Sequence, residues 1–178
     1  MKLLKDILYK AGLNEVIGST NLAIASVCFD SRKAEKDGLF VAVRGTQTDG
    51  HKFIDKVITS GVVAIVCEEL PDDLNEKITY VKVKDCSVAL GLIASNFYDN
   101  PSAELKLIGV TGTNGKTTIA TLLFRLFRSL GHNVGLLSTI QNQINNEIIP
   151  STHTTPDPLQ LNKPVSYTHL TLPTNREV

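Results

Sequence analysis

The chain has 178 residues, of which 42% are hydrophobic and 20% are charged, which is typical of a globular protein and argues against disorder throughout. Its 18 Lys and Arg balance 18 Asp and Glu, and a net charge of zero argues against a nucleic-acid binder that works through overall positive charge. No apolar run reaches the roughly 18 residues of a membrane span, and charges interrupt the N-terminal apolar stretch, so we expect neither membrane insertion nor a secretory signal.

Three cysteines, Cys28, Cys67 and Cys86, are an odd number and lie far apart in the sequence. This spacing argues against a disulfide framework and against a zinc site, and it indicates a reducing compartment. We therefore expect a cytoplasmic protein whose cysteines are small buried side chains.

Hydrophobic spacing in the first part of the chain predicts helices that alternate with strands. In chain order we predict a helix over 2–11 that ends at Gly12, strands over 23–29 and 39–43, a loop over 45–50, a helix over 53–60, strands over 62–67 and 79–83, and a helix over 87–98. This alternation is typical of an α/β fold, and we assign residues 1–98 to a first domain.

The polar segment 99–102 contains Pro101 and predicts a linker, because the residue before a proline is disfavoured in a helix. A second unit follows, with a strand over 105–110, a turn over 111–115, a helix over 116–130 that ends at Gly131, and a strand over 134–137. We assign residues 99–163 to this second domain.

The strongest chemical signal is the segment 107–118, which reads LIGVTGTNGKTT. An apolar strand, a glycine-rich turn and a Lys-Thr pair at a helix start are the parts of a phosphate-binding loop. Glycines let backbone N–H groups curl around a polyphosphate, and the helix N-terminus adds unpaired N–H groups and partial positive charge. Lys116 can then reach the β- and γ-phosphates of a nucleotide, and the Thr117 hydroxyl can bind Mg²⁺.

The common form of this motif places its first glycine where this chain has Val110, with Gly109 and Gly112 on either side. The alternative interpretation is a glycine-rich connection with an incidental lysine. The position of Gly-Lys-Thr-Thr at a predicted helix start, directly after an apolar run, favours the phosphate loop.

The loop 112–118 resembles the ATP loop of the Mur ligase family, whose own loop lacks that first glycine. Three segments of the first domain are similar to the UDP-binding domain of this family: Asp30-Ser31-Arg32, the run 37–42 and the run 45–51. The resemblance implies an α/β protein, with an N-terminal UDP-binding domain followed by the start of a P-loop, parallel-sheet ATP-binding domain.

Two features favour one branch of the family. Thr113 and the segment 153–157 are similar to the ligases that add the third amino acid, diaminopimelate or lysine, to UDP-MurNAc-L-Ala-D-Glu in peptidoglycan synthesis. The alternatives are the branch that adds D-Ala-D-Ala, a folylpolyglutamate synthetase relative, and a non-catalytic nucleotide-binding module. The segments similar to a UDP-binding domain argue against the folate relative.

The resemblance also implies roles for individual residues. Lys116 would be the catalytic residue, and Thr117 would hold Mg²⁺. ATP would bind to the loop residues Gly112, Thr113, Asn114, Gly115, Lys116, Thr117 and Thr118. The UDP end of the substrate would contact Phe29, Ser31, Thr46, Gln47 and Thr48, and its muramoyl-peptide end would contact Thr154 and Thr155. Without the resemblance, Ser31 would be interpreted as the cap of the Asp-Ser-Arg turn, and His51 and His132 as surface or turn residues.

The implied reaction is ATP-dependent amide formation. The side-chain carboxylate of D-Glu attacks the γ-phosphate of ATP, and the amine of the third amino acid then displaces phosphate from the acyl phosphate. Lys116 and Mg²⁺ would stabilise the charge on the transferred phosphoryl group. The partners would be UDP-MurNAc-L-Ala-D-Glu and an amino acid, and we expect a monomer.

Residues 164–178 break the family pattern, since Pro164 and Pro173 interrupt the helical spacing expected there. They resemble translated adapter sequence and predict a non-native tail, with a natural polar extension as the alternative. The chain would then lack the amino-acid site of the family, and we expect it to have no ligase activity by itself. We also expect residues 105–163 to be less stable than residues 1–98, because part of a larger sheet leaves edges uncovered.

Overall fold

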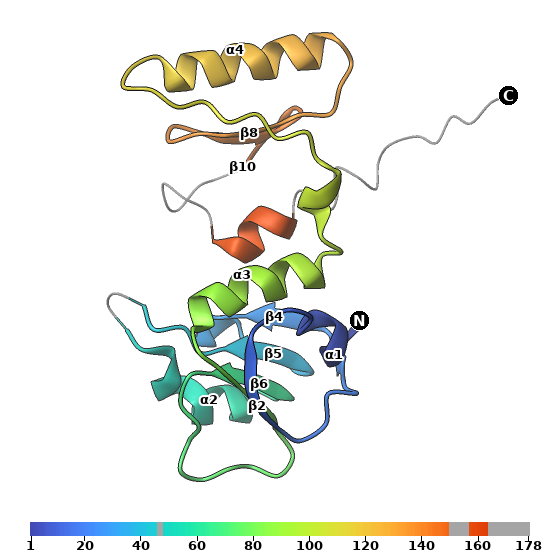
Figure 1. The fold of residues 1–178 in the computed structure, drawn as a ribbon, viewed down its shortest axis with the longest axis vertical. Helices are drawn as coiled ribbons and strands as arrows, with labels where there is room; N and C mark the ends of the chain where they lie inside the picture. The colour runs from blue at the N-terminus through green and yellow to red at the C-terminus, as the bar shows by residue number, and fades with distance from the viewer. Residues whose placement is uncertain (46–47, 150–156, 164–178) are drawn as a thin grey trace, which may run out of the picture. The chain divides into compact units, whose positions relative to one another are not determined.

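The computed structural model describes residues 1–45, 48–149 and 157–163 of the chain (Figure 1). The chain forms two compact units, Met1–Asn100 and Pro101–Val178. Every helix within the described ranges is too short or too polar to cross a lipid bilayer.

A five-stranded sheet in the order β2-β7-β6-β5-β4 forms the centre of the first unit. Its strands are β2 (Leu13–Ile17), β4 (Ser26–Cys28), β5 (Gly38–Val41), β6 (Ala64–Cys67) and β7 (Thr79–Val83). β4, β5, β6 and β7 run parallel, and β2 is antiparallel to β7 at one edge. The predicted α/β class is therefore confirmed, as are the strands predicted over 39–43, 62–67 and 79–83, to within two residues at their ends.

Apolar side chains on both faces of this sheet are buried. The helices of the unit are α1 (Leu4–Ile7), α2 (Ile54–Thr59) and α3 (Cys86–Phe97), with 3-10 turns η1 (Ser31–Lys33) and η2 (Gly50–Phe53). On one face, Val57 of α2 belongs to a buried cluster with Phe40 and Tyr80. Leu39 and Val41 point to the opposite face, because side chains alternate along a strand, and they are buried as well.

α1 and α3 supply further buried side chains and are tied together. The Asn96 side-chain amide of α3 donates to the backbone oxygens of Ile7 (2.9 Å) and Tyr9 (2.7 Å). α3 begins at the N-cap residue Asp85, whose carboxylate accepts from the backbone N–H groups of Ser87 and Val88. The helix predicted over 87–98 is confirmed, and this cap explains its start.

The N-terminal segment differs from the helix predicted over 2–11. Lys2–Leu3 forms β1, which pairs with β3 (Ala23–Ile24), and only Leu4–Ile7 are helical. The pairing with β3 holds the first residues in an extended conformation, so the helix begins later than its apolar spacing predicts. The predicted stop at Gly12 is also wrong, because α1 ends at Ile7 and Gly12, with φ +69°, lies beyond the helix.

Two other strands of the first unit differ from the prediction. The strand predicted over 23–29 is interrupted at Ala25, whose N–H donates to the backbone oxygen of Asp37 and leaves two short strands, β3 and β4. β2 was not predicted, because its residues are mostly exposed and show no alternating burial. Its pairing with β7 depends on backbone hydrogen bonds that side-chain patterns do not reveal.

The second unit contains η3 (Pro101–Glu104), α4 (Lys116–Ser129) and a three-stranded sheet in the order β10-β9-β8. Its strands are β8 (Gly135–Leu137), β9 (Asn142–Ile144) and β10 (Glu147–Ile149), and residues 158–163 form a short helix. The helix predicted over 116–130 is confirmed, and Gly131 follows it with φ +84°.

The predicted strand over 105–110 is wrong. No described segment pairs with these residues, and Leu107 is 89% exposed. β8 does form, but it pairs antiparallel with β9 and does not begin a parallel sheet. A strand needs a neighbour for its N–H and C=O groups, and the hairpin of β8 and β9 supplies one locally.

Most apolar side chains of α4 are not buried in this unit. Phe124 is buried, whereas Ile119, Leu122 and Leu126 are about half exposed. By contrast, the first unit has a core of fully buried side chains on its central strands. The greater stability of the first unit therefore stays a prediction, now with a packing reason.

We predict that Leu39→Ala lowers the free energy of unfolding of the first unit by about 2–5 kcal/mol, because it leaves a cavity at a fully buried site. The matched change Leu122→Ala, at a side chain that is 58% exposed, should cost less than about 1 kcal/mol. Urea unfolding followed by circular dichroism measures both changes. Equal losses of stability in the two variants would contradict this assignment of the core.

Candidate functional site

The predicted phosphate loop has the backbone that anion binding requires. Gly112 has φ +150° and Gly115 has φ +77°, a region that side-chain-bearing residues rarely adopt. A Cβ added at Gly115 would meet only Ile119 Cδ1 at 3.9 Å, so glycine is needed there for its conformation and not for space. The turn over 111–115 and the helix after it are confirmed, although the strand before them is not.

The start of α4 leaves its first turn open to a ligand. Gly115 is the N-cap residue, and without a side chain it gives no cap to the first backbone N–H groups of the helix. The first turn also contains no acidic residue. Residues 112–116 are exposed, so unpaired N–H groups and the positive end of the helix dipole face solvent. This arrangement suits a phosphate.

Lys116 is folded back over the loop. Its ammonium donates to the backbone oxygen of Gly112 and to that of Thr113 (3.1 Å). Its charge is therefore placed above the turn, where the phosphates of a nucleotide would lie. Thr118 is exposed and Thr117 is half-buried on the same turn of α4.

The hydroxyl of Thr117 is the predicted ligand for a cation at this site. In the described ranges, no group of three or more His, Cys, Asp or Glu side chains is placed to hold a metal ion. A hydroxyl beside bound phosphates suits Mg²⁺, which usually keeps several waters and takes few protein ligands. The role of Thr117 stays a prediction.

A second candidate site lies at one edge of the parallel sheet in the first unit. In the parallel pairing of β4 with β5, Cys28 lies beside Phe40. The carboxyl ends of both strands therefore lie on the same side of the sheet. Phe29 and Ser31 follow β4, and the segment 44–50 follows β5. Loops at the carboxyl ends of parallel strands are a common place for ligands.

The structure places some predicted substrate residues and not others. Phe29 is half-buried after β4, Ser31 is the first residue of η1, and Thr48 is exposed after β5. The remaining predicted contacts lie outside the described residues: Thr46, Gln47, Thr154 and Thr155. The structure therefore places Phe29 and Ser31 just after β4 and Thr48 on the segment that follows β5, and their roles stay predictions.

The turn that contains Ser31 is capped by its neighbour. The Asp30 carboxylate accepts from the Arg32 backbone N–H (3.0 Å) and pairs with the Arg32 guanidinium (2.8 Å). Hydrogen bonds from the Arg32 side chain and backbone lower the pKa of Asp30 to about 2. The interpretation of Ser31 as the cap is wrong, because Asp30 caps the turn and the Ser31 hydroxyl makes no hydrogen bond to another described residue. Its hydroxyl is available to a ligand.

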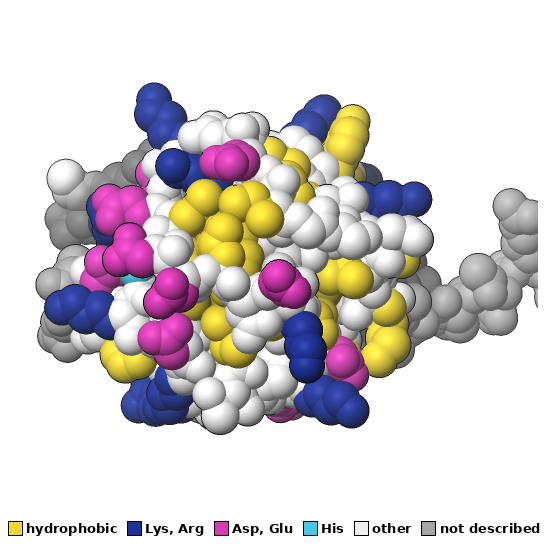
Figure 2. All heavy atoms as spheres, turned by 90° about the horizontal axis from the view of Figure 1, so that it is seen from below, with side chains coloured by type: hydrophobic (Ala, Val, Ile, Leu, Met, Phe, Trp, Pro, Cys, Tyr) yellow, Lys and Arg dark blue, Asp and Glu magenta, His cyan; other side chains and the backbone are white. Residues whose placement is uncertain are grey.

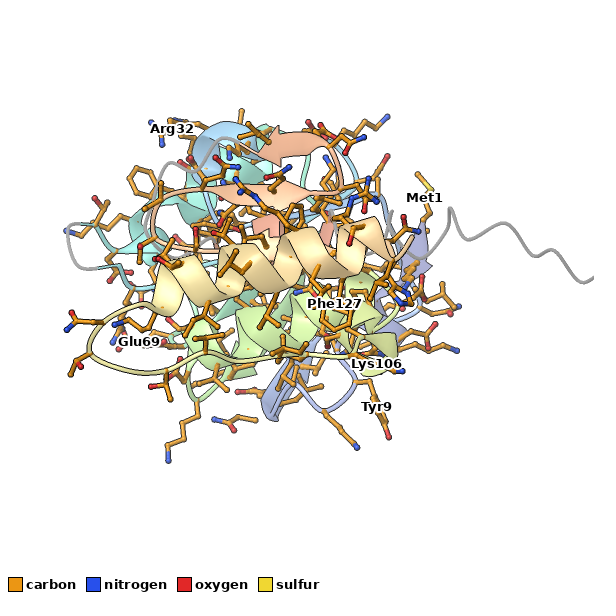
Figure 3. The ribbon with its side chains drawn as sticks, turned by 90° about the horizontal axis from the view of Figure 1, so that it is seen from above. Met1, Tyr9, Arg32, Glu69, Lys106 and Phe127 are labelled. Carbon is orange, nitrogen blue, oxygen red and sulfur yellow. The ribbon has the colours of Figure 1, made fainter. Side chains whose placement is uncertain are left out.

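Sequence reasoning missed a charged network beside the same edge. Arg44 pairs with Glu69 (2.6 Å), Glu68 (3.4 Å) and Asp49 (3.7 Å). His51 lies in the 3-10 turn η2, as expected, and its ring is only 12% exposed and bonds to Asp49 at 2.7 Å. Arg32 and Glu69 both lie at the periphery of the first unit (Figure 3). The sequence signal was Asp-Gly-His after one strand and Glu-Glu after the next.

The cysteines are poor candidates for nucleophilic catalysis. All three are free and buried, as expected. Burial raises the pKa of the Cys28 and Cys67 thiols to about 11 and that of Cys86 to about 12, so little thiolate exists at neutral pH. On the face shown in Figure 2, acidic and basic side chains are interspersed with apolar patches and form no continuous basic surface.

Two family models match the chain. "Mur ligase family, catalytic domain" matches residues 23–98, and "Mur ligase middle domain" matches residues 110–169. The second match includes residues 164–169, the first part of the segment predicted as a non-native tail, which lies outside the described residues.

Two curated relatives of the chain carry the same name. The chain is 56% identical over 161 residues to the UDP-N-acetylmuramoyl-L-alanyl-D-glutamate--2,6-diaminopimelate ligase of Cytophaga hutchinsonii, and 52% identical over 160 residues to the ligase of that name from Phocaeicola vulgatus. Each alignment covers 90% of this chain and 33% of the relative. The chain thus spans about a third of the length of the curated relatives it matches.

Solved structures agree with these matches. A structure of UDP-N-acetylmuramoyl-L-alanyl-D-glutamate--2,6-diaminopimelate ligase aligns with this chain with a TM-score of 0.66 and 26% identity. The alignment covers 90% of this chain and 33% of the chain in that structure. A crystal structure of MurF from Acinetobacter baumannii covers 72% of this chain and 28% of its own, with a TM-score of 0.54 and 26% identity.

We predict a titration midpoint of about 2 for the Asp30 carboxyl, measured by NMR. Because this folded-state pKa lies below the ordinary value of 3.8, the pair with Arg32 stabilises the fold above about pH 4. That contribution is lost as the pH falls through 2. Arg32→Gln should raise the midpoint toward 3.8, whereas Lys33→Gln, which removes a weaker neighbouring charge, should move it much less. A midpoint still near 2 in Arg32→Gln would refute the assigned cause.

Proposed function

The chain belongs to the Mur ligase family, and we propose from this premise that it is part of an ATP-dependent ligase acting on UDP-N-acetylmuramoyl-L-alanyl-D-glutamate. The ligase would add the third amino acid of the peptidoglycan peptide. The names of the relatives favour 2,6-diaminopimelate over lysine as that amino acid.

The observation that supports this proposal is the pairing of two different nucleotide features in one chain. The second unit has an uncapped helix start with a lysine folded over a glycine turn, which suits the phosphates of ATP. The first unit has polar side chains at the carboxyl end of a parallel sheet, including a Ser31 hydroxyl that makes no hydrogen bond to another described residue. A ligase of this kind needs both, one for ATP and one for the UDP-linked substrate.

The chemistry of amide formation explains why the phosphate loop is needed. ATP supplies the phosphoryl group that converts the D-Glu side-chain carboxylate into an acyl phosphate, from which the incoming amine displaces phosphate. The loop N–H groups of residues 112–118 would hold the phosphates in line for this transfer. The Lys116 ammonium would move from the carbonyls of Gly112 and Thr113 to the phosphates, and the Thr117 hydroxyl would hold Mg²⁺.

The first unit would bind the UDP end of the substrate. The Ser31 hydroxyl would hydrogen-bond to the nucleotide, with the Phe29 ring beside it and Thr48 on the neighbouring loop. Thr46 and Gln47 would complete this contact, and Thr154 and Thr155 would hold the muramoyl-peptide end. The fixed turn around Asp30 supports this role, because it presents Ser31 in one orientation.

The branch that adds D-Ala-D-Ala is less well supported. The Acinetobacter baumannii ligase of that branch has a TM-score of 0.53 and covers 72% of this chain, against 0.66 and 90% for the diaminopimelate ligase. We also propose the cytoplasm as the location, since three unpaired cysteines suit a reducing compartment.

We predict that Lys116→Met weakens ATP binding to the chain at least tenfold, because it removes a charged donor from the phosphates. Lys106→Met is the matched control, since Lys106 is an exposed lysine that precedes the loop in the same unit (Figure 3). Isothermal titration calorimetry with ATP and Mg²⁺ measures both variants. If both bind ATP as the unmodified chain does, the loop is not the ATP site.

We predict that Ser31→Ala raises the dissociation constant for UDP-MurNAc-L-Ala-D-Glu about fivefold, the effect of losing one hydrogen bond. Ser60→Ala is the control, because the Ser60 hydroxyl donates to the backbone oxygen of Lys56 at the end of α2, away from the proposed site. The same calorimetry measures the change. Equal affinities in Ser31→Ala and the unmodified chain would remove Ser31 from the substrate site.

A further inference from the structure

His51 links the segment after β5 to the end of β6. Its Nδ1 lies 2.7 Å from Asp49 Oδ1, and its Nε2 accepts the backbone N–H of Glu68 at 2.9 Å. The N–H of Glu69 lies 3.4 Å from the same Nε2. Both ring nitrogens are therefore engaged, and they reach two separate parts of the first unit.

These contacts determine which ring nitrogen carries the proton. A backbone N–H can only donate, so Nε2 must accept and is unprotonated. The proton of the neutral ring is then on Nδ1 and is donated to the Asp49 carboxylate. The ring thus acts as a bridge with a donor at one end and an acceptor at the other.

Asp49 and Arg44 extend this bridge along the segment. The Asp49 carboxylate also accepts the His51 backbone N–H at 2.9 Å, and Arg44 pairs with Glu69 at 2.6 Å. Between them, the Gly45 N–H donates to the Thr48 backbone oxygen at 3.0 Å. Both described ends of the proposed UDP-contact segment are therefore tied to the residues that follow β6.

The network contributes little to the core of the unit. Arg44 is 44% exposed and Glu69 is 73% exposed, and exposed ion pairs add little to stability. The buried cluster around Phe40 and Tyr80 includes none of these charged residues. These hydrogen bonds and ion pairs add little to the stability of the unit, but they hold the segment after β5 in a defined geometry. Such a network suits the placement of a binding segment more than the support of the fold.

We propose that His51 is a positioning residue for the UDP end of the substrate, which it serves by fixing Thr48 and Gly45 through Asp49. This inference rests on the proposed function. The side chain itself does not touch the substrate. It holds the backbone of the segment that would contact the UDP end of the substrate. Loss of the side chain should therefore weaken substrate binding without unfolding the unit.

The test compares His51→Phe, which keeps a ring and removes both hydrogen bonds, with His51→Asn and His51→Gln. Asn can keep a donor near Asp49, and Gln can keep an acceptor near the Glu68 N–H. Calorimetry with UDP-MurNAc-L-Ala-D-Glu should show a dissociation constant about tenfold higher for His51→Phe, with partial recovery in at least one amide variant and unchanged stoichiometry. His132→Phe, a change at an exposed histidine of the second unit, should bind as the unmodified chain does.

A second readout does not depend on the ligand. Amide hydrogen exchange at Gly45 should accelerate in His51→Phe, whereas exchange in β5–β7 should not change. Unchanged affinity and unchanged Gly45 exchange would overturn the proposal, as would a lower binding stoichiometry at unchanged affinity, which indicates a structural role alone. If His51→Phe fails to fold, the test uses His51→Asn and His51→Gln instead. Substrate affinities of both variants within twofold of the unmodified chain would then overturn the proposal. If the unmodified chain does not bind the substrate, the proposed function fails, and Gly45 exchange still tests the bridge.

Discussion

The parallel pairing of β4 with β5 is the constraint on which the proposed substrate edge depends. It places Cys28 beside Phe40, so Phe29 and Ser31 leave the sheet next to the segment that begins after β5. A shift of β5 by one residue would move Phe40 and Val41 to the opposite faces of the sheet and out of their present packing, which fixes the pairing. A rigid sheet therefore supports loops whose polar groups remain available to a ligand.

The candidate site of the second unit depends on backbone groups more than on side chains. The site needs few side chains, because backbone N–H groups and the helix dipole at the start of α4 attract phosphate. The sequence must supply a glycine at a left-handed position, Gly115, and one cationic side chain that folds over the loop, Lys116. Such a site depends on local backbone geometry, so it forms even where α4 has little buried surface.

Features with local sequence signals could be predicted, whereas features that depend on partners distant in the sequence could not. The turn and helix at 111–130 were predictable because their signals are local, as were the buried strands β5–β7. The strand expected over 105–110 failed because apolar character does not supply a pairing partner. His51 lies in the 3-10 turn η2, as expected of a surface or turn residue. Its second partner, the N–H of Glu68, could not be predicted, because it is distant in the sequence and is brought near only by the pairing of β5 with β6.

The central claim is that two units of one chain bind two different ligands, and amide NMR tests it most directly. Addition of UDP-MurNAc-L-Ala-D-Glu should shift the amide signals of residues 29–31 and 48–51, and addition of ATP with Mg²⁺ should shift those of residues 112–118. ATP should leave the signals of residues 29–31 and 48–51 largely unchanged. A UDP substrate that perturbs only the loop before α4, or ATP that perturbs only residues 29–31 and 48–51, would contradict the account.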